Sequence, residues 1–221
     1  MKKLAIIFIC IVFARAGIAQ TNDAQLWSWV SVHKKLTKDL IGTLEQQVRL
    51  DHNISFPKNI FTELRMAYRF NKYVKYTISY RFMNRGQVEG GFVTGNRFTG
   101  DLRLRYKKKP FILSYRNRMQ REYRMEEEGI RQINYNRNKM GLALDLDKKF
   151  SPFASFEIYY HLNNAEFNKN RYTLGVEFDL KKRNELDVFY RIQQDYNVND
   201  RERSYVIGIG FSHSFKGTLF K

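Results

Sequence analysis

Apolar and polar positions alternate from residue 171 to residue 192, in the stretch RYTLGVEFDLKKRNELDVFYRI. Apart from the basic turn at residues 181–184, every second position holds a large apolar side chain, and most intervening positions are polar or charged. Successive side chains of a strand point to opposite faces, so the pattern predicts a two-faced β-hairpin. Because Leu180 and Leu186 must share a face, we expect a connection of about three residues with Asn184 in the left-handed conformation. This pairing places Asp179 opposite Asp187.

The same alternation recurs through the chain, and no stretch after residue 20 keeps apolar residues at helical spacing for three turns. The sequence therefore predicts an all-β fold, an antiparallel up-and-down barrel of about ten to twelve strands. Single-chain bacterial barrels normally have an even number of strands. We recognise eleven alternating runs, so either LWSWVSV at residues 26–32 is a partial strand or a twelfth run is hidden.

Two kinds of connection alternate along the chain. Short basic turns lie near residues 71–72, 107–110, 147–150 and 181–184, and longer polar loops such as NISFPK, GQVEGGFVTGN, MEEEG and VNDRER fall between them. In an up-and-down barrel these two sets lie on opposite rims. Short turns on one rim and long loops on the other are typical of outer-membrane barrels, whose short turns face the periplasm.

The alternation alone does not say which face of each strand meets water. A soluble barrel would have to enclose about five large apolar side chains from each strand, but the interior of a small barrel is already filled by fewer and smaller ones. Turned outward, the same residues form a lipid-facing band with strands of the length that a membrane requires. We therefore expect a transmembrane barrel, with a soluble periplasmic lipid-binding barrel as one alternative.

Aromatic residues and the end of the chain support the membrane interpretation. Many of the 18 Phe and 14 Tyr residues lie near predicted strand ends, where membrane barrels carry aromatic girdles. The segment GIGFSHSF alternates and ends in Phe215, which resembles the assembly signal at the carboxyl end of bacterial outer-membrane barrels. We expect girdle positions at Tyr73, Phe82, Tyr106, Phe111, Tyr172 and Tyr196.

The first residues predict export. Lys2 and Lys3 precede an apolar run that ends at Phe13, followed by small residues up to Ala19, which is the layout of a signal peptide. We expect a signal peptide at residues 1–19 and a single barrel domain at residues 20–221, located in the outer membrane. The lone cysteine, Cys10, lies in the signal, which excludes a disulfide scaffold and a thiolate metal site in the mature chain.

The mature chain keeps a strong positive charge. Losing the signal leaves 36 of the 39 basic residues against 22 acidic ones. These charges are spread over many strands instead of forming one patch, so we expect no nucleic-acid partner. The expected partners are outer-membrane lipid, the outer-membrane assembly machinery during insertion, and a small anionic solute.

Turned inward, the polar positions place arginines and carboxylates in one lumen. Guanidinium groups can pair bidentately with carboxylates on neighbouring strands, which would fill the lumen with ion pairs. The alternative is a narrow pore in which the excess of arginine favours anions. The predicted lumen charge network consists of Glu45, Arg49, Glu63, Arg65, Arg69, Arg81, Asp101, Arg103, Arg105, Arg116, Arg118, Glu122, Glu157, Arg171, Glu177, Asp179, Asp187 and Arg191.

Enzymatic chemistry has few candidate residues. A lipid-modifying barrel, an acyl hydrolase or transferase, would need Ser and His at the membrane interface, and the candidates are His161, Ser212, His213 and Ser214. Neighbouring residues of a strand point to opposite faces, so His213 and an adjacent Ser do not converge without a partner strand or a bulge. The chain has no P-loop, paired-His motif or calcium loop, so we expect no cofactor, no metal and, by default, no enzyme.

Several segments together suggest a family. They are Trp27 and Trp29 followed by KKLTKDL, EQQVR at residues 45–49, SYRFMNRG at residues 79–86, and LSYRNRMQREYR from Leu113. Their placement of arginines and aromatics over nearly the whole mature chain resembles domain of unknown function family 2490. The resemblance implies an exported outer-membrane β-barrel of a Gram-negative bacterium and supplies no catalytic residues. We therefore expect a small channel, a structural barrel or a platform for surface loops.

Overall fold

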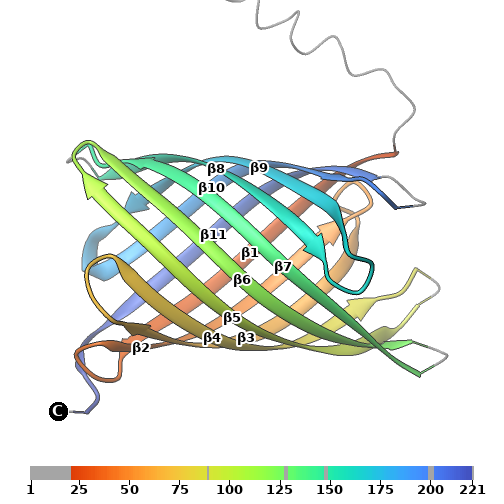
Figure 1. The fold of residues 1–221 in the computed structure, drawn as a ribbon, viewed down its shortest axis with the longest axis horizontal. Coiled ribbons are helices and arrows are strands. Elements are labelled where there is room, and N and C mark those ends of the chain that lie inside the picture. Colours follow the sequence, from red (N-terminus) through yellow and green to blue (C-terminus); the bar gives the residue numbers. More distant parts are fainter. Residues whose placement is uncertain (1–20, 89, 127–128, 147–148, 199–201, 221) are drawn as a thin grey trace, which may run out of the picture.

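The computed structural model describes residues 21–88, 90–126, 129–146, 149–198 and 202–220, so the predicted signal peptide lies outside the described residues. The described chain forms one closed barrel in which hairpins follow each other around the wall (Figure 1). Its strands are β1 (Thr21–Lys35), β2 (Leu40–Asp51), β3 (Phe56–Arg69), β4 (Val74–Gly86), β5 (Phe92–Lys108), β6 (Phe111–Glu126), β7 (Gly129–Leu144), β8 (Phe150–His161), β9 (Glu166–Asp179), β10 (Asn184–Asp195) and β11 (Glu202–Thr218).

The predicted all-β barrel of ten to twelve strands is confirmed, since the described residues form eleven strands, but neither of the two suggestions that would make the number even is right. LWSWVSV belongs to a strand of 15 residues, β1, which pairs with β2 on one side and with β11 on the other. Consecutive strands run antiparallel, so an odd number makes the first and last strands parallel. The barrel therefore closes through a parallel seam, with Leu26 beside Ile207 and Val30 beside Phe211.

Glycines and aromatic rings fit together along this seam. Trp29 pairs with Gly210 across the seam, and Phe189 of β10 pairs with Gly208 of β11. A Cβ atom added at Gly210 would overlap the Trp29 ring, and one added at Gly208 would overlap the Phe189 ring. The two rings themselves lie 5.7 Å apart between centroids. The absent side chains thus leave the space inside the wall that the two rings occupy.

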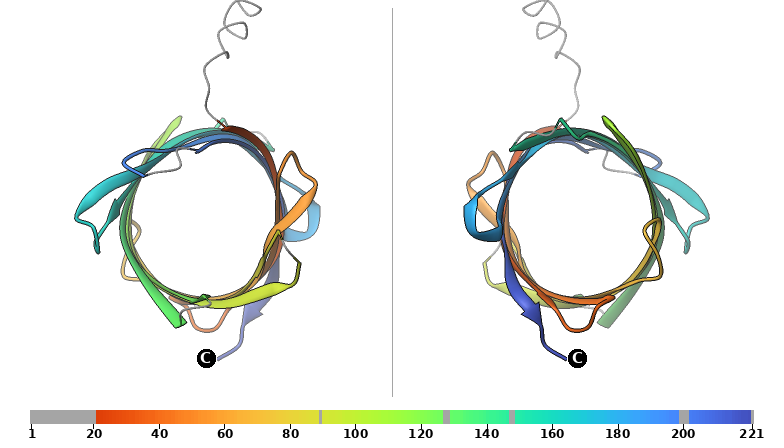
Figure 2. Two further views of the ribbon diagram at one scale, coloured as in Figure 1. Left: turned by 90° about the vertical axis from the view of Figure 1, so that its right-hand side faces the viewer. Right: turned by 90° about the vertical axis from the view of Figure 1, so that its left-hand side faces the viewer.

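Figure 2 shows the barrel from both ends as a closed ring of strands. The apolar side chains of these strands face outward around the whole ring. Leu174 and Met140 are 64% and 65% exposed, whereas Thr173, next to Leu174 in sequence, is 4% exposed. A soluble barrel with these residues at its centre would show the opposite pattern. The part of the chain that the structure describes contains no helix long and apolar enough to cross a membrane.

Aromatic rings form pairs on the outer face toward both ends of the strands. Tyr73 and Tyr106 stack with centroids 6.4 Å apart beside the turns that join β3 to β4 and β5 to β6, and Tyr190 and Tyr205 stack at 6.5 Å farther along the wall. Of the expected girdle residues, Tyr196 is half-buried. The others are exposed: Tyr73, Phe82, Tyr106, Phe111 and Tyr172. Their contact with a bilayer interface stays a prediction.

The connections on the two rims are similar in length. We call the rim with connections 36–39, 70–73, 109–110, 145–149 and 180–183 the turn rim, and the rim with connections 52–55, 87–91, 127–128, 162–165 and 196–201 the loop rim. The prediction of long loops is wrong because the strands extend into the segments that were predicted as loops. FVTGN, the second half of the predicted loop at residues 86–96, is the start of β5 and pairs with β4. The longest strands, β5, β6, β7 and β11, have 16 or 17 residues.

The hairpin between β9 and β10 follows the prediction in part. Its connection is a short 3₁₀ turn of three residues, Lys181–Arg183, closed by a hydrogen bond from the Leu180 amide to the Asn184 carbonyl at 2.8 Å. The predicted length is therefore confirmed. The left-handed residues are Lys182 and Arg183, whereas Asn184 is extended. The pairing is shifted by two residues, so Asp179 lies opposite Glu185, not Asp187.

Candidate functional site: the charged lumen

The inward face of β3 and β4 carries a buried ion pair. Glu63 is 1% exposed and accepts a hydrogen bond of 2.5 Å from the Arg81 Nε atom. An arginine on the same strand as the glutamate, Arg65, lies 3.6 Å from the Glu63 carboxylate and donates to Glu45 of β2 at 2.6 Å. The alternation of the strands brings these residues together, because all four occupy inward positions on three adjacent strands.

A bidentate pair joins β5 to β6 at the same face. The Nε atom of Arg118 donates to one oxygen of Asp101 at 2.6 Å, and a terminal nitrogen donates to the other oxygen, also at 2.6 Å. Both residues are buried, and their backbones are directly opposed in the sheet. Planar guanidinium and carboxylate groups match in this fork geometry, which fixes both side chains against the wall.

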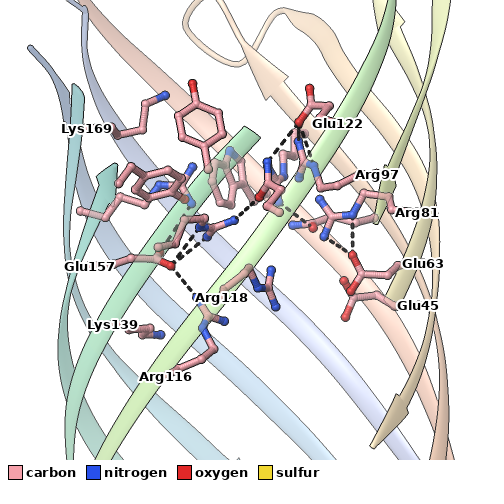
Figure 3. Close-up of a pocket in the computed structure, with 18 of the residues that line it drawn as sticks. Glu45, Glu63, Arg81, Arg97, Arg116, Arg118, Glu122, Lys139, Glu157 and Lys169 are labelled. Carbon is pink, nitrogen blue, oxygen red and sulfur yellow. Dashed lines mark hydrogen bonds and ion pairs between the residues drawn. The ribbon is translucent and has the colours of Figure 1, made fainter. Parts of the chain in front are cut away.

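Glu122 collects the largest number of donors in the lumen (Figure 3). It is 1% exposed and receives charge-assisted hydrogen bonds from Arg97, from Arg124 at 2.6 Å, and from Arg85 at 3.1 Å. Gln120 also donates to it at 3.2 Å. Three guanidinium groups around one carboxylate leave this part of the lumen with net positive charge.

Glu157 of β8 forms a second such centre, two strands farther along the wall from Glu122. Arg116 donates to it at 2.5 Å and Arg137 at 2.9 Å, and Arg171 approaches to 3.8 Å. Arg137 also donates to the side-chain oxygen of Gln120 at 2.8 Å. Since Gln120 donates to Glu122, a continuous hydrogen-bonded chain runs from β8 to β6 inside the barrel, as the dashed lines of Figure 3 show.

These centres surround a polar cavity of about 300 Å³ in the middle of the lumen. Its wall contains ten arginines, Lys139 and Lys169, but only four carboxylates. Among the described residues, the cavity lining therefore carries three times as many cationic groups as anionic ones. A small anion inside it would meet a positive field from several strands at once.

The predicted lumen network separates into two parts. The members with ion pairs are Glu45, Glu63, Arg65, Arg81, Asp101, Arg116, Arg118, Glu122, Glu157 and Arg171. Within the described ranges, no ion pair of 4.0 Å or less involves the remaining members, which are Arg49, Arg69, Arg103, Arg105, Glu177, Asp179, Asp187 and Arg191. A functional role for either part stays a prediction.

The unpaired members near the turn rim are largely open to solvent. Arg103 and Arg105 on β5 and Glu177 and Asp179 on β9 are all exposed, and Asp187 is half-buried. The charged side chains at this end of the lumen are therefore solvated, whereas the ion pairs around the cavity are buried.

Sequence reasoning missed several members of the site. Arg97 donates hydrogen bonds to Glu122 and Arg137 donates to Glu157, and Trp27 lines the cavity. Arg97 has the same parity as Asp101 on β5, so extending the predicted alternation by four residues would have found it. Trp27 gave no such signal, because LWSWVSV has bulky residues at both parities.

The candidate enzymatic residues do not form a catalytic group. Ser212 points inward and shares a 2.9 Å hydrogen bond with Ser31, whereas His213 bonds Asn184 at 2.7 Å. His161 lies at the end of β8 on the loop rim, where its Nδ1 atom accepts from the Asn164 amide at 3.1 Å. In the part of the chain described by the structure, neither histidine bonds Ser212 or Ser214. Ser31 and His33 lie 3.2 Å apart, but Ser31 is 2% exposed.

Titratable groups on the loop rim form a small ion cluster. The His52 ring bonds Asp51 at 2.9 Å, and Lys58 contacts the same carboxylate at 2.8 Å. The hydrogen bond and the charge of Asp51 raise the pKa of His52 above its usual value. In the acidic loop after β6, Glu126 pairs with Arg131 at 3.6 Å, and the residues that follow, 127 and 128, lie outside the described ranges. No group of three or more potential metal ligands exists among the described residues.

Two solved structures of bacterial proteins resemble this chain in fold to different degrees. The β domain of the Bordetella autotransporter BrkA is similar with a TM-score of 0.55 and 12% identity, over 80% of this chain and 82% of that one. The anion-selective porin of Comamonas acidovorans gives a TM-score of 0.39 and 13% identity, over 76% of this chain and 55% of the porin. No curated protein matches the sequence significantly.

The similarity to the autotransporter domain supports the barrel architecture, which fits an outer-membrane protein. A family described as "Protein of unknown function (DUF2490)" matches residues 24–204, which is most of the barrel. The chain belongs to this family.

Proposed function

We propose that the protein is an integral outer-membrane barrel that forms a narrow channel preferring small anions. The observation that carries this proposal is the central cavity, whose wall holds twelve cationic groups against four carboxylates. Rings of arginine and lysine favour anions in pores, and the low-dielectric barrel wall strengthens their field. The long side chains of these arginines and lysines line a cavity of about 300 Å³, which admits only small solutes.

The outer surface supports the membrane location. Outward positions are apolar over four or five residues of most strands near the turn rim, for example Tyr76, Ile78, Tyr80 and Phe82 on β4. Alternating residues over about ten positions, at roughly 3.3 Å each and tilted by about 40°, make a band of about 25 Å. This height matches the hydrocarbon-facing band of outer-membrane barrels.

The orientation follows from where this band ends. On β6 and β7 the outward positions toward the loop rim include the polar residues Asn117, Arg121, Asn134 and Asn136, with Met119 between the first two. This half of the hairpin therefore extends beyond the apolar band, as the ends of extracellular hairpins do. The turn rim, with lysines or arginines in its connections, would then face the periplasm.

Single-channel recording tests the proposal. The mature protein, refolded and inserted into a planar bilayer under a KCl gradient, should conduct with a reversal potential of the sign expected for chloride. Lys139→Gln removes one cation from the cavity wall and should reduce the anion preference. Arg121→Gln removes the same charge from the outer face, where Arg121 bonds Asn134, and should leave selectivity unchanged.

Two outcomes would overturn the channel proposal. A folded barrel with no conductance above that of the bare bilayer would indicate a structural barrel with a closed lumen. A reversal potential of the opposite sign would show that the arginine excess does not control permeation.

A further inference from the structure

We infer that the lumen contains a binding site for one small tetrahedral oxyanion with two negative charges, phosphate or sulfate, formed by Arg49, Arg171 and Arg191 around Trp27. The inference deepens the proposed channel function and rests on it only for the route by which the anion enters. Its elements are three arginines from three strands, one aromatic ring and the central cavity that all four residues line.

The three guanidinium groups converge on a single indole. Their central carbon atoms lie 3.8 Å, 5.3 Å and 4.9 Å from the Trp27 ring centroid for Arg49, Arg171 and Arg191 respectively. Any two of these carbons are therefore within about 10 Å of each other. Trp27 is itself held in place, because its Nε1 atom donates to Gln25 at 3.1 Å and the ring is 5% exposed.

Carboxylates do not neutralise this cluster as they do elsewhere in the lumen. The nearest approach is 3.8 Å, between Arg171 and Glu157, and that glutamate already accepts from two other arginines. Within the described part of the chain, Arg49 and Arg191 have no carboxylate within ion-pairing distance. Three like charges confined at this distance repel each other unless a counter-ion joins them.

The remaining hydrogen bonds of the three arginines go to neutral acceptors. Arg171 donates to Gln193 at 2.8 Å, Arg191 to Thr173 at 2.9 Å, and Arg49 to Gln47 at 3.1 Å. The buried Nε atom of Arg49 has no partner among the described atoms. A guanidinium that stacks on an aromatic ring uses its face, so the N–H donors at its edge stay available to an oxyanion.

The cavity has the size for such a ligand. Its 300 Å³ are many times the roughly 10–15 Å³ that one water molecule requires in a cavity. Phosphate or sulfate fits with part of its hydration shell. Three converging cations favour a dianion over a monoanion, which distinguishes these two ions from acetate or chloride.

Isothermal titration with inorganic phosphate tests the site in the refolded mature barrel, in a non-ionic detergent and at constant ionic strength. We expect saturable binding of one phosphate, similar binding of sulfate, and much weaker binding of acetate. Arg49→Gln and Arg191→Gln should each weaken phosphate binding at least tenfold. Arg103→Gln, which removes a charge that lies outside the cavity lining, should change it less than twofold.

Tryptophan fluorescence tests the site without any arginine variant, in case such a variant does not fold. Trp29→Phe leaves Trp27 as the single tryptophan of the chain, and its emission should change saturably with phosphate but not with chloride at equal ionic strength. If the control Arg103→Gln weakened phosphate binding as much as Arg49→Gln and Arg191→Gln do, the site would be overturned. Binding of acetate as tight as that of phosphate would overturn it too. Saturable phosphate binding without conductance would retain the site and reject the channel.

Discussion

Glu122→Gln probes the lumen at its most highly charged centre. The substitution keeps the shape of the side chain but removes the one negative charge shared by Arg85, Arg97 and Arg124. It also turns an acceptor into an amide whose N–H groups face guanidinium donors. The carboxylate is 1% exposed, so little water is available to compensate.

The expected loss of stability follows from these contacts. A charge pair at about 4 Å is worth about 4 kcal/mol at an effective dielectric constant near 20. The gain from three such pairs is offset by the several kcal/mol needed to desolvate the carboxylate. Arg85 and Arg124 also have side chains 34% and 29% exposed, which screens their share. We therefore expect a net loss of about 3–5 kcal/mol, the range found when one partner of a buried pair is removed.

Equilibrium urea unfolding of the barrel from lipid vesicles measures this loss. Glu126→Gln is the matched control, because its 3.6 Å pair with Arg131 joins two exposed side chains and should contribute less than about 1 kcal/mol. A Glu122→Gln barrel that unfolds within about 1 kcal/mol of the wild type would refute the reasoning that buried ion pairs hold the lumen together.

Three further predictions concern the seam, the rims and one histidine. Gly210→Val should destabilise the barrel by about 1–3 kcal/mol in the same urea assay, because its Cβ would overlap the Trp29 ring, and full stability would contradict the seam packing. Single cysteines at Lys182 and Asn164 should react with an impermeant thiol reagent from opposite sides of the membrane, since they lie on opposite rims; labelling from one side alone would exclude this topology. Because Asp51 raises the pKa of His52, the stabilisation by this pair is fully present below the unfolded pKa of about 6.5 and is lost as the pH rises through the folded pKa. NMR titration measures the folded pKa, and a value at or below about 6.5 would show that the pair with Asp51 does not form.

Sequence alternation predicted the fold class and the direction of most side chains. Tyr172 and Leu174 are exposed and Thr173 is buried, as a period of two requires. Strand number was harder to predict, because LWSWVSV has bulky residues on both faces and gave no sign that β1 is a full strand. The parallel seam depends on that count alone.

The partners within the lumen could not be predicted from alternation. Glu122 meets Arg97 and Arg85, which are 25 and 37 residues away in sequence, only because of the register of β4, β5 and β6. A shift of two residues preserves every side-chain direction while changing every pair, as the hairpin at Asp179 illustrates. Register is set by turn geometry, and the left-handed residues of that turn were predicted one or two positions too late.

The account as a whole depends on lipid surrounding the apolar face of the strands. Spin labels on single cysteines at Leu174 and Thr173 test this directly, because these neighbours point to opposite sides of the wall. In liposomes, the label at Leu174 should be relaxed by oxygen and shielded from a water-soluble nickel complex, and the label at Thr173 should be restricted and protected from oxygen. A label at Leu174 that is accessible to the nickel complex, in a barrel that stays folded and monomeric without detergent, would contradict the account.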